Sequence, residues 1–97
     1  MQGPIYKFYR LRPTEAYYAL SQAERDALLT KLGELRTQQG VKSIVDCNSA
    51  WHDERWIAFG LEEFPDMQTV ANHTAALLAL DLFRYVESET MLGTATE

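Results

Sequence analysis

A well-bounded helix between residues 21 and 40 is the feature that most constrains how this chain can fold. Ser21 is a good N-cap, and Glu24, three residues later, completes a capping box. Gly40 predicts the end of the helix, because glycine adopts the left-handed conformation of a C-cap without strain. The apolar positions form one stripe at helical spacing, namely Leu28, Leu29, Leu32 and Leu35. The segments on either side of this helix therefore decide the fold class.

Four other segments have the composition of β-strands. They are residues 5–11, 41–51, 55–64 and 85–92. The first is rich in aromatic side chains, and Pro13 ends it because proline cannot donate to a strand ladder. The second and third are joined by a short polar turn and predict a hairpin. A second helix begins at Asp66, a good N-cap, and ends within residues 80–83.

The order strand, helix, strand, strand, helix, strand predicts a ferredoxin-like βαββαβ sandwich of the α+β class, as a single domain over residues 1–97. Right-handed crossovers place both helices on one face of a four-stranded antiparallel sheet. The uncovered face is expected to carry Trp56, small residues and the aromatic side chains of the first strand. An exposed apolar face usually marks an interface, so we expect a two-fold homodimer with its sheets face to face. The alternative is a monomer whose open face is half polar.

The register of the hairpin follows from its alternating pattern. Ile57, Phe59 and Leu61 share one face of the second strand, and a buried face should not also hold Asp46 and Asn48. We therefore predict a register that puts Val45 and Cys47 beside the apolar residues, on the side of the helices. The opposite face then carries Asp46, Asn48, Trp56, Ala58 and Gly60.

Composition argues against several kinds of partner and site. The 97 residues include 14 acidic and 9 basic side chains, and the net charge of −5 with no basic patch predicts no binding to nucleic acid. No apolar run is long enough to cross a membrane, and the first residues do not resemble a leader, which favours a cytoplasmic location. Cys47 is the only cysteine, so no intrachain disulfide or cysteine-based zinc site forms. His52, Asp53 and Glu54 are expected to be solvated turn residues rather than metal ligands, and no cofactor fingerprint is present.

Two basic residues in the first strand predict a charged side chain in a buried position. Lys7 and Arg10 are an odd number of residues apart, so they point to opposite faces of a central strand. One of them must therefore lie under the helices or within the dimer interface, unless it is at a strand end. A buried cation needs a partner, and the nearby carboxylates are Asp46, Glu62 and Glu87. This cation either forms a structural ion pair or clamps an anion or enolate in a pocket. The pocket is expected to be lined by Tyr6, Phe8, Tyr9 and Trp56.

Two stretches resemble the dimeric α+β-barrel superfamily. In EFPDMQTVANH at residues 63–73, a strand ends in an aromatic residue, an Asp-containing turn opens a helix, and a histidine lies within that helix. RLRPT at residues 10–14, followed by Leu20 and Ser21, resembles the darcynin-like proteins of the same superfamily. The superfamily includes antibiotic-biosynthesis-type monooxygenases and muconolactone-isomerase-like proteins. The resemblance implies a small dimeric domain, with His73 at the position of the helix histidine.

These observations support two classes of function. The first is a domain that binds a small apolar or cyclic organic molecule between the sheet and the second helix, without a cofactor. As an enzyme it would be a cofactor-free monooxygenase or isomerase, in which His73 moves a proton and Arg10 binds an oxyanion or carboxylate. The second is a non-catalytic dimerising accessory domain. The first class requires Arg10 to point to the helix side; if Lys7 points there instead, the pairing with His73 fails.

Overall fold

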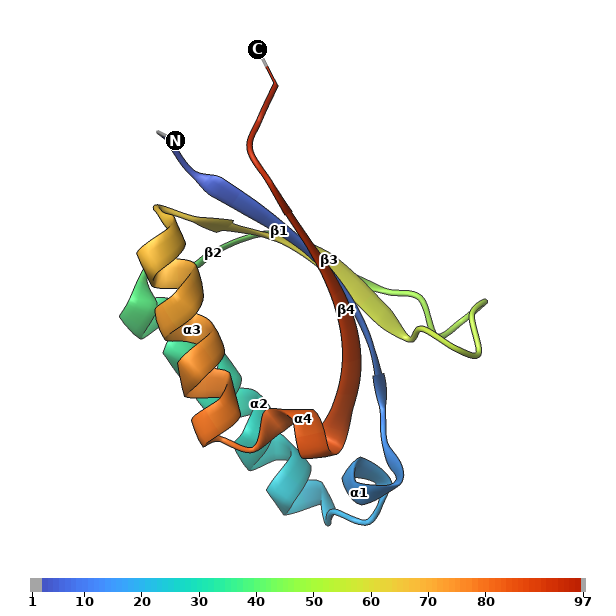
Figure 1. Ribbon diagram of the computed structural model, residues 1–97. Coiled ribbons are helices and arrows are strands. Elements are labelled where there is room, and N and C mark those ends of the chain that lie inside the picture. The colour runs from blue at the N-terminus through green and yellow to red at the C-terminus, as the bar shows by residue number, and fades with distance from the viewer. Residues whose placement is uncertain (1–2, 97) are drawn as a thin grey trace.

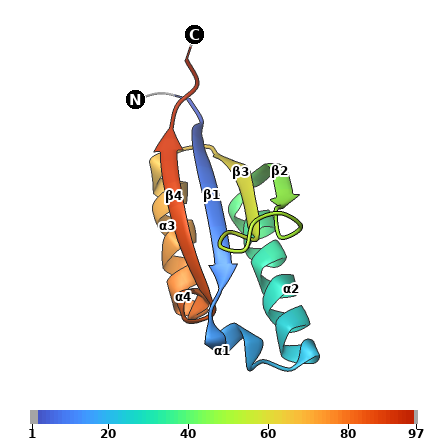
Figure 2. The ribbon, with the colours of Figure 1, turned by 90° about the vertical axis from the view of Figure 1, so that its right-hand side faces the viewer.

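The computed structural model describes residues 3–96 of the chain, so the first two residues, which contributed to the argument against a leader, lie outside the described residues. The strands are β1 (Ile5–Pro13), β2 (Lys42–Asn48), β3 (Ala58–Phe64) and β4 (Val86–Gly93); the helices are α1 (Glu15–Tyr18), α2 (Gln22–Gln39), α3 (Met67–Ala79) and α4 (Leu82–Tyr85). The strands form one antiparallel sheet in the order β2-β3-β1-β4. Helices α2 and α3 lie on one face of it, and Figure 2 shows the other face uncovered. The predicted α+β class and four-stranded antiparallel sheet are confirmed.

The structure contains the helix-capping interactions from which the helix boundaries are predicted. The Ser21 hydroxyl accepts a hydrogen bond from the Glu24 backbone N–H at 3.1 Å, and the Glu24 carboxylate accepts one from the Ser21 N–H at 2.8 Å. Gly40 ends α2 with a φ of 68°. Asp66 caps α3 by accepting a hydrogen bond from the Thr69 N–H at 2.7 Å. The end of α3 has no glycine, and Asp81 takes the left-handed conformation there, with a φ of 58°.

The most deeply buried apolar residues gather at one end of the sheet. Phe64, which is fully buried, pairs with Ile5 across β3 and β1 and packs with Val41 and Val70. The leucine stripe of α2 does not join this core. Leu29 is 57% exposed, and no residue of α2, all of which lies in the described range, is buried. One buried cluster thus joins the sheet to α3 at this end, and Leu77 and Leu82 are buried outside it.

The register predicted for the hairpin is confirmed, but its orientation is wrong. Val45 pairs with Leu61 and Cys47 with Phe59, as expected. These residues lie on the open face, however, and Cys47 points away from the helices. The reason is strand parity: Phe64 turns towards the helices, and the residues two and four positions before it must follow. Residues 60 and 62 therefore face the helices, and Phe59 and Leu61 face outwards.

Candidate functional site

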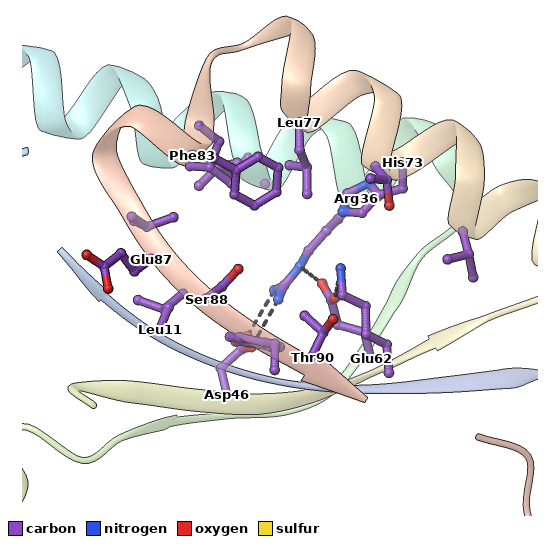
Figure 3. A pocket seen from close by; sticks show the side chains of 18 of the residues that line it. Leu11, Arg36, Asp46, Glu62, His73, Leu77, Phe83, Glu87, Ser88 and Thr90 are labelled. Carbon is purple, nitrogen blue, oxygen red and sulfur yellow. Dashed lines mark hydrogen bonds and ion pairs between the residues drawn. The ribbon is translucent and has the colours of Figure 1, made fainter. Parts of the chain in front are cut away.

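A cleft of about 920 Å³ separates the sheet from the helices, on the side predicted for a ligand pocket. Its apolar wall comes mainly from the helices, with Leu29, Leu32, Val70, Leu77, Leu82 and Phe83. Its floor is the helix-facing side of the sheet, and it is largely polar, with Lys7, Tyr9, Asp46, Glu62, Ser88 and Thr90. Figure 3 shows Leu77 and Phe83 on the helix side of the cleft, opposite Asp46 and Thr90. A cleft with one apolar wall and one polar wall suits an organic molecule that has a polar group.

Arg36 crosses this cleft from α2 and joins the two layers. Its Nε donates to Glu62 Oε2 at 2.8 Å, and its two terminal nitrogens donate to Asp46 at 3.0 and 3.1 Å (Figure 3). Glu62 is only 5% exposed, so its charge is compensated inside the protein. The planar guanidinium suits this geometry, because it offers donors in a fixed fork that matches carboxylates.

Tyr9 completes the carboxylate end of this network. Its hydroxyl donates to Asp46 Oδ1, and the Ser43 hydroxyl donates to Asp46 Oδ2 at 2.9 Å. The Tyr9 ring reaches Asp46 by passing over Gly60, where an added Cβ would come within 2.6 Å of the Tyr9 oxygen and of the Val45 carbonyl oxygen. A glycine inside a strand is here required by the close approach of an aromatic side chain.

The network shifts the proton affinities of its members. The hydrogen bonds from Arg36 lower the pKa of Asp46 well below its ordinary value. Burial, together with the hydrogen bond to Asp46, raises the pKa of Tyr9 to about 12. Burial by itself would lower the pKa of Arg36, but its hydrogen bonds to Asp46 and the charges of both carboxylates raise that pKa. Near neutral pH, Asp46 and Arg36 are therefore charged and Tyr9 is protonated.

Lys7 is the second cation of the floor, and it is held more loosely than Arg36. Its side chain is 12% exposed, its Nζ lies 3.9 Å from Glu62 Oε1, and it stands 5.8 Å from the centre of the Phe64 ring. Burial lowers the pKa of Lys7, and the positive charge of Arg36 adds to this, whereas Glu62 opposes it. Lys7, Arg36, Asp46 and Glu62 together carry no net formal charge, and Glu87 adds one negative charge to the lining of the cleft.

His73 lies at the boundary between the cleft and the core. It is 3% exposed, its Nδ1 is 2.7 Å from the Gln39 side-chain oxygen, and its ring is 5.6 Å from that of Phe64. An amide oxygen only accepts, so Nδ1 carries the proton and Nε2 is the acceptor of the neutral ring. Burial lowers the pKa of His73, which favours this neutral form at pH 7.

The predicted convergence of Arg10 with His73 is wrong. Arg10 points to the open face, where its Nε donates to Glu89 at 2.9 Å and its guanidinium lies 4.3 Å from the Trp56 ring. Strand parity is the reason: the position that faces His73 from β1 belongs to Lys7, three residues earlier. The cleft thus pairs the helix histidine with a lysine.

The four residues predicted to line the pocket are divided between the two faces. Tyr9 lies in the cleft. Tyr6 and Phe8 alternate with it along β1 and point to the open face. Trp56 precedes β3 and stacks there with Arg10 and with Arg12, whose guanidinium is 5.4 Å away. The aromatic wall expected around one ligand does not form as a unit.

Arg36 and Gly60 are the site residues that sequence reasoning missed. Arg36 follows Leu29 and Leu32 at helical spacing, so a cation on the apolar stripe was a readable signal of a charge turned towards the sheet. Gly60 interrupts a strand pattern, which indicates a close approach of another group. The sequence indicated Glu62 only as an available carboxylate partner for a buried cation, and Glu62 does pair with Lys7 and Arg36.

Other kinds of site find no support in the residues described. Within residues 3–96, no group of three or more His, Cys, Asp or Glu side chains is arranged to hold a metal ion. No helix in the same range is long and apolar enough to span a membrane. No family model matches the chain, and a search of curated proteins finds no match either.

Proposed function

We propose that this chain is a small-molecule-binding domain whose ligand, an apolar or cyclic organic molecule with one polar group, occupies the cleft between the sheet and the helices. The observation that carries this proposal is the cleft itself, about 920 Å³ in volume, with apolar side chains on its helix side and a charged floor. Ligand sites in proteins span roughly 300–1,000 Å³ and combine an apolar lining with a few polar groups. The leucine stripe of α2, left unburied, supports the proposal because it supplies apolar surface that a ligand would cover.

Titration with a neutral aromatic probe tests this proposal. We expect 2-naphthol to shift the amide NMR signals of α2, α3 and the helix-facing residues of β4 in a saturable way. Thr74→Trp would fill part of the cleft and weaken binding, because Thr74 lines it, whereas Ala75→Trp on the same helix lies outside the lining and should not. Shifts confined to the open face, or equal binding by both variants, would overturn the proposal.

The same proposal includes a ferredoxin-like sandwich that forms a homodimer through its open face. The strand order β2-β3-β1-β4 and the succession of elements support that fold. The open face exposes Phe8 and Phe59, each at 39%, together with Val45 and Met91. A second copy of the chain brings the same apolar patch, so a two-fold contact between sheets would cover both patches at once.

Sedimentation equilibrium tests the dimer. Phe59→Asp should dissociate it at micromolar concentration, because the variant places a charge at the centre of the apolar patch. Leu78→Asp is a matched control, since Leu78 is a 61% exposed residue of α3 outside the patch. A wild-type chain that sediments as a monomer would contradict this part of the proposal.

Cofactor-free proton transfer, as in an isomerase or a monooxygenase, is a second candidate function, and the state of His73 favours it. The ring donates through Nδ1 to Gln39 and is neutral near pH 7, so its Nε2 can accept a proton from a bound carbon acid. We expect the chain to accelerate deuterium exchange at the carbon next to the carbonyl of 2-tetralone, and His73→Gln to abolish the acceleration. An exchange rate equal to that of buffer would exclude this candidate for ketones of that class.

A further inference from the structure

We propose that the Lys7 ammonium is the recognition group of the cleft, and that it selects ligands that carry a carboxylate. This inference rests on the proposed function and names the chemical class of its ligand. It concerns a cation of the floor whose ammonium makes no hydrogen bond among the described residues and lies 3.9 Å from its carboxylate partner, Glu62.

The competing cation, Arg36, is already paired with two carboxylates. Arg36 directs Nε and both terminal nitrogens at Glu62 and Asp46, at 2.8 to 3.1 Å. Asp46 also accepts from Tyr9 and Ser43. A ligand anion that approached Arg36 would meet the negative charges of these two carboxylates, so Arg36 is a structural member of the floor rather than a free site.

Lys7 stands apart from this network. Within residues 3–96 its ammonium makes no hydrogen bond, and its partner Glu62, at 3.9 Å, is already held by Arg36 at the other oxygen. An ammonium has three donors and is costly to bury without acceptors. The lowered pKa of Lys7 agrees with this geometry, because it means that the surrounding groups compensate the charge incompletely.

A carboxylate meets this demand better than the other polar groups a cyclic ligand can carry. It brings acceptor atoms to an ammonium that makes no hydrogen bond, and a negative charge to a cation that shares its partner Glu62 with Arg36. A ligand amine would instead place a further positive charge beside Lys7, and a hydroxyl would bring an acceptor atom without a negative charge. Thr90, which pairs with Tyr9 across β1 and β4, and Ser88 line the same floor, and their hydroxyls can donate to a second carboxylate oxygen.

The experiment compares 2-naphthoate with 2-naphthol by calorimetry, since the two probes share a ring system and differ in charge. We expect 2-naphthoate to bind at least about tenfold more tightly, because a hydrogen bond to a charged group is worth more than a neutral one. Lys7→Met keeps an unbranched side chain but removes the ammonium, and it should remove this preference, with 2-naphthoate binding weakened by about ten- to a hundredfold. Binding of 2-naphthol should change by less than about threefold, which also shows that the variant is folded.

Arg10→Met is the matched control, because it removes a cation from the same strand on the opposite face. It should leave the affinity for both probes unchanged. If 2-naphthol binds in the cleft but 2-naphthoate is not preferred, or if Lys7→Met retains the preference, the inference about Lys7 fails and the binding proposal stands. If neither probe binds, the binding proposal fails and takes this inference with it.

Discussion

Replacing Arg36 by methionine should destabilise this protein more than any other single change to its charged side chains. The variant leaves Glu62, which is 5% exposed, without its hydrogen-bonded partner, and the remaining cation, Lys7, is 3.9 Å away. Removing one member of a buried ion pair costs about 3–5 kcal/mol. Asp46 adds less, because its side chain is 48% exposed and water screens its charge. A chain of 97 residues has a total stability of about 5–15 kcal/mol, so the variant should lose a large share of it.

Urea unfolding followed by circular dichroism measures this loss, and a double-mutant cycle assigns it. Arg36→Met by itself should lower the free energy of unfolding by about 3 kcal/mol or more. Adding Glu62→Gln to Arg36→Met should restore part of it, because the amide no longer carries the buried charge. The coupling energy between the two positions should reach about 1–3 kcal/mol.

Arg12→Met provides the matched control for this cycle. Arg12 also pairs with a carboxylate, that of Glu87, but these two side chains are 35% and 56% exposed, against 6% for the side chain of Glu62. An exposed pair contributes about 0–1 kcal/mol, so this variant should be nearly as stable as the wild type. If Arg36→Met proves no more destabilising than Arg12→Met, the reasoning about a buried charge beneath α2 is wrong.

Two further perturbations test the surroundings of the cleft. Gly60→Ala should destabilise the protein by about 1–3 kcal/mol, because the new Cβ meets Tyr9 and a backbone oxygen at 2.6 Å. Gly33→Ala has open space around its Cβ and should stabilise α2 by about 0.5–1 kcal/mol. Thermal unfolding should show a lower melting temperature for the first variant and a higher one for the second. The pKa of His73 is lowered by burial from an ordinary value of 6.5, so the unfolded chain binds its proton more readily and stability should fall as the pH drops below about 6.5. Urea unfolding at pH 7 and pH 5 should show this fall, and His73→Gln should reduce it; an equal fall in the variant would assign the pH dependence to other groups.

The candidate site was only partly predictable because it depends on side chains from distant segments. A ligand pocket between the sheet and the second helix, with His73 and a central-strand cation on its walls, could be expected from the order of the elements and from strand parity. Whether this cation is Lys7 or Arg10 could not be predicted. The ion pairs of Arg36 could not be predicted either, because its partners Asp46 and Glu62 are 10 and 26 residues away in the sequence and no local pattern reveals these contacts.

Local sequence patterns predict the two long helices and the pairing of the hairpin strands. The capping box of Ser21 and Glu24, the left-handed Gly40 and the cap at Asp66 act within one turn of the chain, so their effects are legible locally. The pairing of Val45 with Leu61 follows from alternation, which is also a local property.

The face of the sheet that lies beneath the helices depends on packing between distant segments, and no local pattern specifies it. Alternation divides β3 into Phe59 and Leu61 on one side and Gly60, Glu62 and Phe64 on the other, and it does not state which side is inside. From its hydrophobicity, the pair Phe59 and Leu61 is expected to face the helices. Phe64 decides the matter, because it adjoins the turn into α3 and is fully buried against Ile5, and the rigid two-residue period then carries Glu62 inwards with it. The polar floor of the cleft and the apolar open face both follow from that one choice.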